Sequence, residues 1–413
     1  MSKRGFANIE SIMPRINDQV MERQKVKNHN IDLSSAENWL IRPELVEICK
    51  DAIQKDLTAK HLSYPDGFSG HPYLLSALSN FFNSHFHPHR PVEPHQLAIT
   101  PGAAGCIDAI AFNICNPGEG VLVPAPYWNG FDFLLEVRSS VVPIAVKLPD
   151  LASTLTLDLI PALEAAYQNA TIPVRALIIT NPHNPIGQCY SRSVLEACVK
   201  FCAKKDIHLI FDEVYAMTSF PCPELVDPPP FVSGLALDIE ALGGKPNMVH
   251  VIWSSSKDFG QSGVRMGCIV TQSNKELHVG LALAANTQTS SLSAIFLSEL
   301  LNSPRLPSLL QLNSERLEQA YTTLTSFFKK HSILYIPAYA GLYVFARFVP
   351  DAVEWEDESR MLARIKEVGV LLSAGKNYHG PEGEKGWFRV GFAFESSVLD
   401  NALRRMDKVF ADR

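Results

Sequence analysis

The chain has 413 residues, of which 46% are hydrophobic and 19% charged, with 37 Lys and Arg against 43 Asp and Glu. This composition excludes a disordered chain, a collagen-like repeat and a coiled coil, and a net charge of −6 leaves no basic excess for binding nucleic acid. No apolar run approaches a membrane span, and the N-terminal residues lack the apolar core of a secretory signal. We therefore expect an intracellular, cytoplasmic protein with neither nucleic acid nor membrane as partner.

Short apolar segments alternate with amphipathic ones from about residue 95 onward. The apolar segments predict strands at 97–100, 121–124, 141–146, 175–180, 207–211 and 249–253. The segments between several of these strands have the apolar spacing of helices. This alternation predicts an α/β fold with a mainly parallel central sheet covered by helices.

A second unit is predicted beyond residue 305, where the segment NSPRLPS interrupts the alternation. A long amphipathic helix, short strands and a final helix follow, which is typical of a smaller α+β domain. We divide the chain into an N-terminal arm that also belongs to the small domain (1–55), a large α/β domain (56–305) and a C-terminal small domain (306–413). The eight cysteines are scattered without a C-x-x-C pair, which favours reduced, mostly buried thiols.

Polar residues follow the predicted strands directly, where ligands of open α/β sheets bind. Strand 207–211 runs into Asp212 and Tyr215, and strand 249–253 runs into Ser254 and Lys257. A lysine at a buried strand end can act as an amine nucleophile, and an aspartate there is costly unless a cation meets it. Each residue taken alone is also typical of a turn, a helix cap or a solvated loop.

Other strand ends carry further candidates. Ala103 and Ala104 open a helix after strand 97–100, which suits a phosphate, and Arg265 could also hold one. Asn184 lies in a tight Asn-Pro loop and Trp128 follows another strand, although turn chemistry and core packing explain these positions too. Together the strand ends supply a phosphate cradle, a stacking ring, a counter-ion for a ring nitrogen and an amine. Those are the requirements of pyridoxal 5′-phosphate.

The order of these motifs resembles a known family. With Ser35-Ala36-Glu37-Asn38 near the start and LLSAGKNYHGPEGEKGWFRVGFAF near the end, the chain resembles the fold-type I pyridoxal-phosphate enzymes of aminotransferase class I/II, in their 1-aminocyclopropane-1-carboxylate (ACC) synthase-like branch. The resemblance covers nearly the whole chain. It implies the PLP-transferase fold, an α-amino-acid substrate and a homodimer with active sites at the subunit interface.

The resemblance implies a role for each matching residue. Lys257 would form the Schiff base with the cofactor and then transfer protons, while Asp212 would pair with the protonated ring nitrogen. Tyr215 and Asn184 would hydrogen-bond the ring oxygen, and Trp128 would stack on the ring. Residues implied to hold the cofactor's phosphate are Ala103, Ala104, Ser254 and Arg265. Residues implied to lie at the substrate carboxylate are Arg389, Asn38 and Ala36.

Four features depart from the family pattern. The tyrosine that reaches the partner subunit's phosphate is assigned to Tyr64, although alignment on Gly70 places Phe68 where ACC synthases have it. His183 stands where Ser or Thr is commoner, and Asn129 stands where Pro is usual. No tyrosine precedes Tyr64 to face the substrate. These departures favour a substrate other than S-adenosylmethionine.

Several functions remain open from the sequence. We favour a lyase or transferase of specialised metabolism, acting by β- or γ-elimination such as C–S cleavage. The first alternative is an aminotransferase that exchanges the amino group with a 2-oxo acid. The second is a non-catalytic cofactor-binding regulator, which is disfavoured because no helix-turn-helix pattern precedes the core. A metal site is also disfavoured, since the prolines among the nearby histidines predict an exposed connector; these histidines are His85, His87, His89 and His95.

Overall fold

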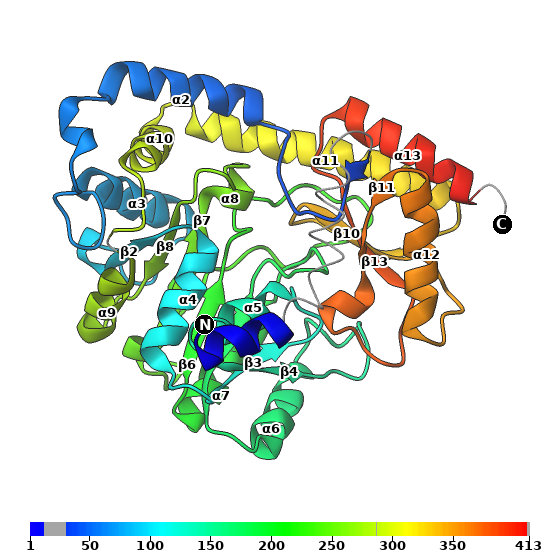
Figure 1. Cartoon of the computed structure of the whole chain (residues 1–413), viewed down its shortest axis with the longest axis horizontal. Coiled ribbons are helices and arrows are strands. Elements are labelled where there is room, and N and C mark those ends of the chain that lie inside the picture. Colours follow the sequence, from blue (N-terminus) through cyan, green and yellow to red (C-terminus); the bar gives the residue numbers. More distant parts are fainter. Residues whose placement is uncertain (12–29, 286, 411–413) are drawn as a thin grey trace.

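A seven-stranded sheet in the order β2-β8-β7-β6-β5-β3-β4 forms the centre of the computed structural model, which describes residues 1–11, 30–285 and 287–410 (Figure 1). Its strands are β2 (Leu97–Thr100), β3 (Gly120–Pro124), β4 (Val142–Val146), β5 (Val174–Thr180), β6 (His208–Asp212), β7 (Val249–Ser254) and β8 (Gly267–Val270). Neighbours from β7 to β4 are parallel, whereas β8 is antiparallel to both of its neighbours. The predicted α/β fold with a mainly parallel sheet is confirmed.

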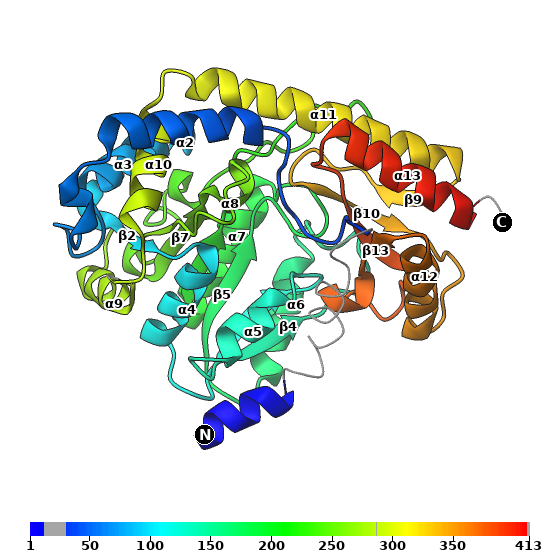
Figure 2. The same cartoon turned by 45° about the horizontal axis from the view of Figure 1, so that its top comes forward.

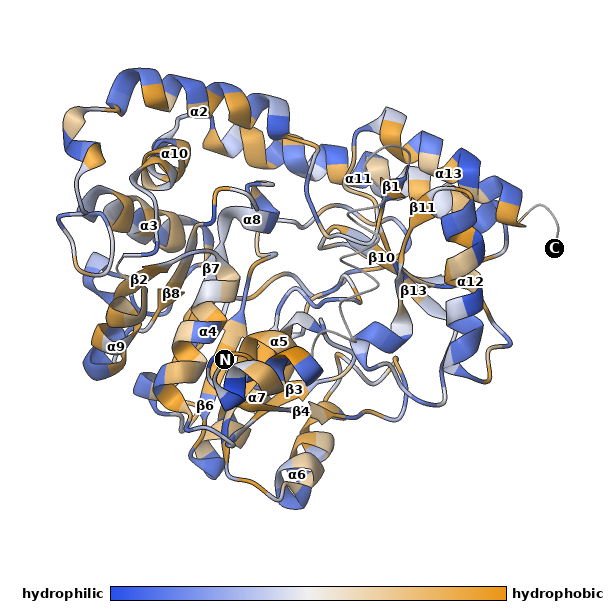
Figure 3. Cartoon of the chain, viewed as in Figure 1, coloured by the Kyte–Doolittle hydropathy of each residue, from blue (hydrophilic) through white to orange (hydrophobic). Residues whose placement is uncertain are grey.

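Helices cover both faces of this sheet because successive strand residues point to opposite sides and are apolar on each. On β7, Ile252 packs in a core cluster with α4, α5 and α9, whereas Val251 and Trp253 pack in another with α3, α7 and α10. Figure 3 shows the strands coloured mostly as hydrophobic at the centre. The helices are α3 (Pro72–His85), α4 (Ala103–Ile114), α5 (Gly130–Glu136), α6 (Leu159–Asn169), α7 (Arg192–Lys205), α9 (Lys275–Ala285) and α10 (Ser291–Asn302).

A four-stranded antiparallel sheet with the order β12-β13-β10-β9 lies at the other end of the molecule (Figure 1). It packs with the last helices around a core of its own. Beside it, β1 (Ile31–Asp32) pairs in parallel with β11 (Val370–Leu371). The remaining elements of this unit are β9 (Leu334–Ile336), β10 (Tyr343–Arg347), β12 (Ser373–Ala374), β13 (Trp387–Gly391), α12 (Trp355–Glu367) and α13 (Ser396–Phe410).

One long helix connects the two cores. The first turns of α11 (Leu306–Lys330) place Leu306 and Leu309 in the core of the large sheet, while Leu317 and Leu324 belong to the core of the small one. Helix α2 (Arg42–Asp56) runs along the same side of the molecule (Figure 2). The segment between β1 and α2 therefore passes from the small sheet to the large one, and it borders the cavity described below.

No helix among the described residues is both long and apolar enough to cross a bilayer. All eight cysteines are free, as the sequence predicted. Two histidines of the 85–95 segment contact different acidic residues: His89 lies 3.5 Å from Asp238, and His95 lies 3.2 Å from Glu93.

Candidate active site

Parallel pairing brings the carboxyl ends of β5, β6 and β7 to one edge of the large sheet. Thr180 lies opposite Asp212 in the β5–β6 register, and Asp212 lies opposite Ile252 in the β6–β7 register. Strand β7 continues directly into the short helix α8 (Ser255–Asp258), which carries Lys257. A cavity of about 390 Å³ opens at this edge, and Arg389 of the small sheet lies on its opposite wall.

Asp212 is a buried carboxylate with one unused oxygen. Its Oδ2 atom accepts a 3.5 Å hydrogen bond from Thr180, whereas Oδ1 has no hydrogen-bond partner among the described residues. Burial raises the pKa of Asp212 to about 7. A buried acceptor of this kind is costly unless a donor or cation meets it, so the cavity is suited to a cationic N–H group at this point.

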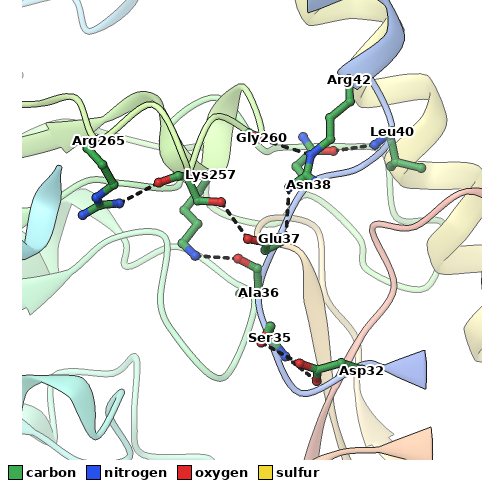
Figure 4. Close-up of polar contacts among 11 residues, drawn as sticks. Asp32, Ser35, Ala36, Glu37, Asn38, Leu40, Arg42, Lys257, Gly260 and Arg265 are labelled. Atoms are coloured by element: carbon green, nitrogen blue, oxygen red, sulfur yellow. Dashed lines mark hydrogen bonds and ion pairs between the residues drawn. The ribbon is translucent and has the colours of Figure 1, made fainter. Parts of the chain in front are cut away.

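Lys257 extends from α8 toward the segment that joins β1 to α2. Its Nζ atom donates a 2.5 Å hydrogen bond to the backbone oxygen of Ala36 (Figure 4). Burial lowers the pKa of Lys257 to about 8, and the Arg389 guanidinium acts in the same direction. Part of the amine is therefore neutral near physiological pH, as a nucleophile or a proton acceptor requires.

The start of α4 forms an anion cradle with Arg265. The first N–H groups of a helix lack partners within it and attract anions. Gly102 precedes α4 with a φ of +82°, and a Cβ atom there would lie 2.5 Å from Nη2 of Arg265. Glycine thus lets Arg265 approach this turn and donate 2.9 Å to the oxygen of Pro101. With Ala103 and Ala104 on the cavity wall, the cradle suits a phosphate dianion.

Arg389 is held at two of its nitrogens. Nη1 donates to Oδ1 of Asn184 at 2.9 Å, and Nη2 donates to the oxygen of Ser34 at 2.6 Å. Its Cζ atom lies 4.8 Å from the ring centre of Tyr343 and 5.1 Å from that of Tyr378. A guanidinium has five donors, so this arrangement fixes its plane while N–H groups remain for a ligand carboxylate.

Two predicted aromatic residues border the same cavity. Trp128 is 37% exposed and packs edge-on against Phe131, with ring centres 5.8 Å apart. Tyr215 is 3% exposed and lies perpendicular to Tyr343 at 5.4 Å. Burial raises the pKa of Tyr215 to about 12, so its phenol stays protonated and can donate a hydrogen bond.

Three predicted residues are not among the described residues that line the cavity. Ser254 donates to the oxygen of Met266 at 2.8 Å and accepts from the nitrogen of Ser256 at 3.2 Å, so its hydroxyl caps α8. Ser256, which the sequence did not single out, is the serine that borders the cavity. Ser256 therefore borders the cavity where the resemblance implied Ser254, two residues earlier in the chain.

Asn38 and Tyr64 are the other two residues. The resemblance implied Asn38 near the substrate carboxylate and Tyr64 at the cofactor of the partner subunit. Nδ2 of Asn38 donates to Asn313 in α11 at 2.8 Å, and Oδ1 accepts from the nitrogen of Leu40 at 3.1 Å. Asn38 therefore fixes the segment behind the cavity wall, while Ala36 borders the cavity itself. Tyr64 is 86% exposed among the described residues and does not line the cavity.

Glu37 is a site residue that sequence reasoning passed over. Its Oε1 atom accepts from Ser262 at 2.7 Å and Oε2 accepts from Arg42 at 2.9 Å. Although burial acts to raise it, these hydrogen bonds hold the pKa of Glu37 below its ordinary value. Figure 4 shows Glu37 between Lys257 and Arg42. In the sequence Glu37 lies between Ala36 and Asn38, which the resemblance placed near the substrate carboxylate. A charged residue at that position could have been recognised as part of the site, because a buried charge needs an ionic or hydrogen-bonding partner.

Pyridoxal 5′-phosphate fits these residues. The unused Oδ1 of Asp212 suits a protonated ring nitrogen, the cradle at Gly102 suits the phosphate, and Lys257 supplies the amine. All three open onto one cavity whose remaining wall presents Trp128 and Arg389. The charges of the cofactor would thus each meet a complementary group.

Comparisons with known proteins agree with this fit. Residues 29–406 match the family Aminotransferase class I and II. The chain is 54% identical to "Probable aminotransferase aclI" of Aspergillus oryzae, over 99% of this chain and 97% of that protein. It is 28% identical to 1-aminocyclopropane-1-carboxylate synthase 1 of Prunus mume, over 95% of this chain and 79% of that protein.

Among solved structures, the chain resembles a double mutant of Thermus thermophilus aspartate aminotransferase with a TM-score of 0.78. The two share 21% identity over 99% of each chain, and this likeness confirms the fold. The predicted family, cofactor and enzyme class are therefore confirmed. The chain belongs to the aminotransferase class I and II family of pyridoxal-phosphate-dependent enzymes, and its relatives include ACC synthases.

Proposed function

We propose that the enzyme binds an α-amino acid through Arg389 and moves the proton on its Cα through Lys257. The observation that carries this proposal is the shared cavity, which is lined by Lys257, by Arg389 and by Asp212 with its unused oxygen. When bound, pyridoxal phosphate delocalises the negative charge left on Cα. The residues of this chain then have to orient the substrate, hold the ring-nitrogen proton and exchange protons.

Orientation is the proposed task of Arg389. Its hydrogen bonds to Asn184 and Ser34 and the flanking rings of Tyr343 and Tyr378 fix the guanidinium plane. A carboxylate bound in the plane of a fixed guanidinium is itself fixed. The direction of the Cα–H bond is then set by two points, the carboxylate at Arg389 and the amino group near Lys257.

Proton transfer is the proposed task of Lys257. A pKa of about 8 makes the amine a base matched to neutral pH. Its hydrogen bond to Ala36 holds Nζ at the cavity rather than in solvent. Asp212 carries the counter-charge, and a cation against Oδ1 favours its ionised form.

For the fate of the substrate we propose β- or γ-elimination, with a sulfur-bearing amino acid as the first candidate. The relationship to an ACC synthase supports departure of a γ-sulfur group as a reaction within reach of this scaffold. The positions of His183 and Asn129 support a substrate other than S-adenosylmethionine. Amino transfer to a 2-oxo acid is the second candidate, and the name of the Aspergillus oryzae relative favours it.

The holoenzyme should be incubated with a panel of amino acids, with and without a 2-oxo acid. Release of ammonia together with thiol or a 2-oxo product, without an acceptor, supports elimination. Amino exchange that depends on the acceptor supports the second candidate instead. Lys257→Ala serves as the control, because either reaction should stop without the amine. Turnover that survives in Lys257→Ala contradicts both.

We also propose that the enzyme works as a homodimer. Six large apolar side chains are exposed within a short stretch at one end of the molecule, with Leu62 and Tyr64 more than four-fifths exposed. They are Ile53, Leu57, Leu62, Tyr64, Phe68 and Tyr73. In this arrangement Tyr64 serves the cofactor of the other subunit.

Subunit hybrids test the shared site. Lys257→Ala and Tyr64→Ala should each be impaired alone, and a reassociated mixture should regain activity, because one site of each hybrid then holds both native residues. A fully active Tyr64→Ala variant would transfer the role to Phe68. A monomer by light scattering contradicts the dimer.

A further inference from the structure

We call the part of the chain around the seven-stranded sheet the large unit and the part around the four-stranded sheet the small unit. The loop between β12 and β13 belongs to the small unit and forms part of the cavity wall. It includes η5 (Gly375–Tyr378), and Tyr378 borders the cavity with its ring 5.1 Å from Cζ of Arg389. Buried Glu358 of α12 holds both ends of this loop. Its oxygens accept hydrogen bonds from the nitrogens of Lys376 at 2.9 Å and Gly386 at 2.8 Å. The loop is therefore fixed at its base within the small unit.

The tip of the same loop contacts the large unit through His379. The His379 ring stacks on the ring of Tyr127, with centres 4.4 Å apart and planes 22° apart. Nε2 of His379 lies 2.9 Å from Oδ2 of Asp132 in α5, and Oδ1 of Asp132 accepts 2.8 Å from the Tyr127 hydroxyl. The nitrogen of Tyr127 also donates 2.8 Å to the oxygen of Tyr378. We call Tyr127, Asp132 and His379 the cross-cavity clamp.

The clamp lies one residue behind each wall of the cavity. Tyr127 is followed by Trp128, the ring proposed to stack on the cofactor, and His379 is preceded by Tyr378, which flanks Arg389. The contacts of the clamp therefore join the wall that would hold the cofactor to the wall that would hold the substrate carboxylate. A change in the clamp alters the spacing of the two walls without removing any group that touches a ligand.

The backbone supports a positioning role for His379. Its φ is +55°, in the left-handed region that is uncommon for residues other than glycine, although histidine adopts it more often than most. Such a conformation persists where the surrounding contacts determine it. Here the ring stack and the contact with Asp132 are those contacts.

We propose that Tyr127, Asp132 and His379 position Arg389 relative to the bound cofactor, and so set the affinity for the substrate carboxylate. This inference rests on the proposed function of Arg389. It assigns a positioning role to three residues that would touch neither substrate nor cofactor. The clamp should matter more for amino-acid binding than for cofactor binding, because the residues of this chain proposed to hold the cofactor all belong to the large unit.

The probe is an amino acid whose Cα hydrogen is replaced by a methyl group, since it can bind but cannot lose a Cα proton. Its dissociation constant is read from the change in the visible absorbance of the holoenzyme. We expect His379→Ala and Asp132→Asn each to weaken binding roughly tenfold, as for loss of one hydrogen bond to a charged group. The double variant should be little weaker than either single one, because the two residues act on one contact.

The chain provides a matched control in His331 and Asp407. Nε2 of His331 lies 2.6 Å from Oδ1 of Asp407, and its ring packs 4.7 Å from Phe327. Neither residue of this pair borders the cavity. His331→Ala should change the dissociation constant of the probe less than twofold, although it removes a similar pair. Cofactor affinity, from titration of the apoenzyme, should be similar in all of these variants.

Two further variants keep the test decisive. His379→Asn retains a residue that tolerates positive φ but removes the stacked ring, so an affinity equal to that of the wild type would overturn the proposal. If His379→Ala fails to fold, Tyr127→Phe removes only the hydroxyl that donates to Asp132, and we expect a smaller but measurable loss. Equal probe binding by wild type and clamp variants, or equal weakening in His331→Ala, overturns the clamp. A wild-type holoenzyme that does not bind the probe at all instead contradicts the role proposed for Arg389.

Discussion

The two walls of the cavity are built in different ways. The wall with Asp212 and Lys257 lies at the end of the parallel part of the large sheet, whose strands are buried on both faces. The wall with Arg389 combines β13 with the two-residue strands β1, β11 and β12 and with loops held by side chains such as Glu358. We infer that the first wall carries the shared chemistry, whereas the second can vary to select the substrate without disturbing the cofactor.

Replacement of Asp212 by Asn should give the largest effect, because Asp212 lies on the wall to which we assign the shared chemistry. The amide carries no charge to hold a proton on the ring nitrogen, so kcat/KM should fall by about 10²–10³-fold or more. Thr180→Val removes only the 3.5 Å contact to the same carboxylate, and its effect should stay below about tenfold. Steady-state kinetics of the two variants measure this, and an Asp212→Asn enzyme with near wild-type activity would contradict the assignment.

Replacement of Arg389 by Lys acts on the other wall. An ammonium cannot donate at once to Asn184, to Ser34 and to a carboxylate in one plane. We expect kcat/KM to fall roughly 30-fold or more, mainly through KM, with the visible band of the cofactor retained. Arg347→Lys, on the neighbouring strand β10 of the same sheet, is the matched control. Equal effects of the two substitutions would show that Arg389 has no special place.

Glu358→Ala tests how the loop between β12 and β13 is held in place. It leaves the backbone nitrogens of Lys376, Gly386 and Trp387 without their acceptor, and the last two of these hydrogen bonds are buried, so the free energy of unfolding should fall by about 1–3 kcal/mol. Denaturant unfolding measures the change, and Glu356→Ala, at an exposed residue of the first turn of α12, should have little effect. An unchanged unfolding midpoint for Glu358→Ala would mean that the loop is held by other contacts.

The smallest predicted effect is the loss of folding stability at acidic pH that comes from His183, in the loop after β5. Burial lowers the pKa of His183 to about 3, against an ordinary value of 6.5, so His183 is neutral in the folded chain and takes up a proton on unfolding. Its contribution is complete above pH 6.5 and is lost as the pH falls toward 3. Relative to His183→Asn, the wild type should lose about 1.6 kcal/mol of stability between pH 6.5 and pH 5.

The difference between the two proteins is the quantity to measure by denaturant unfolding at each pH. Asp212 and Glu213 have pKa values raised by burial to about 7 and about 8, which favours the folded state as the pH falls. Both proteins share these residues, so their effect cancels in the difference. A difference that does not change with pH would mean that His183 takes up its proton over the same pH range in the folded and unfolded chains.

The same contrast explains what the sequence could predict. Alternating apolar and amphipathic segments indicated the parallel strands and their carboxyl-terminal polar residues, because those depend on local periodicity. Strand β8 was not predicted, since four residues after the Lys257 loop give too little pattern to reveal an antiparallel return. Strand β9 was missed for the same reason.

The positions of other residues at or near the site depend on contacts between distant parts of the chain. Asn38 donates a hydrogen bond to Asn313, which is 275 residues away in the sequence. His379 contacts Asp132, which is 247 residues away. No local pattern records such pairs. The exchange of Ser254 for Ser256 at the cavity depends on a single turn of α8, which is finer than periodicity can resolve.

Peptide mapping after borohydride reduction of the holoenzyme tests the central claim most directly. Reduction makes the bond between the cofactor and its lysine permanent, so mass spectrometry can locate it. We predict that the added mass lies on Lys257, in the peptide that contains Ser254-Ser255-Ser256-Lys257-Asp258. Cofactor attached to any other lysine, or visible absorbance with no reducible bond, would contradict the account.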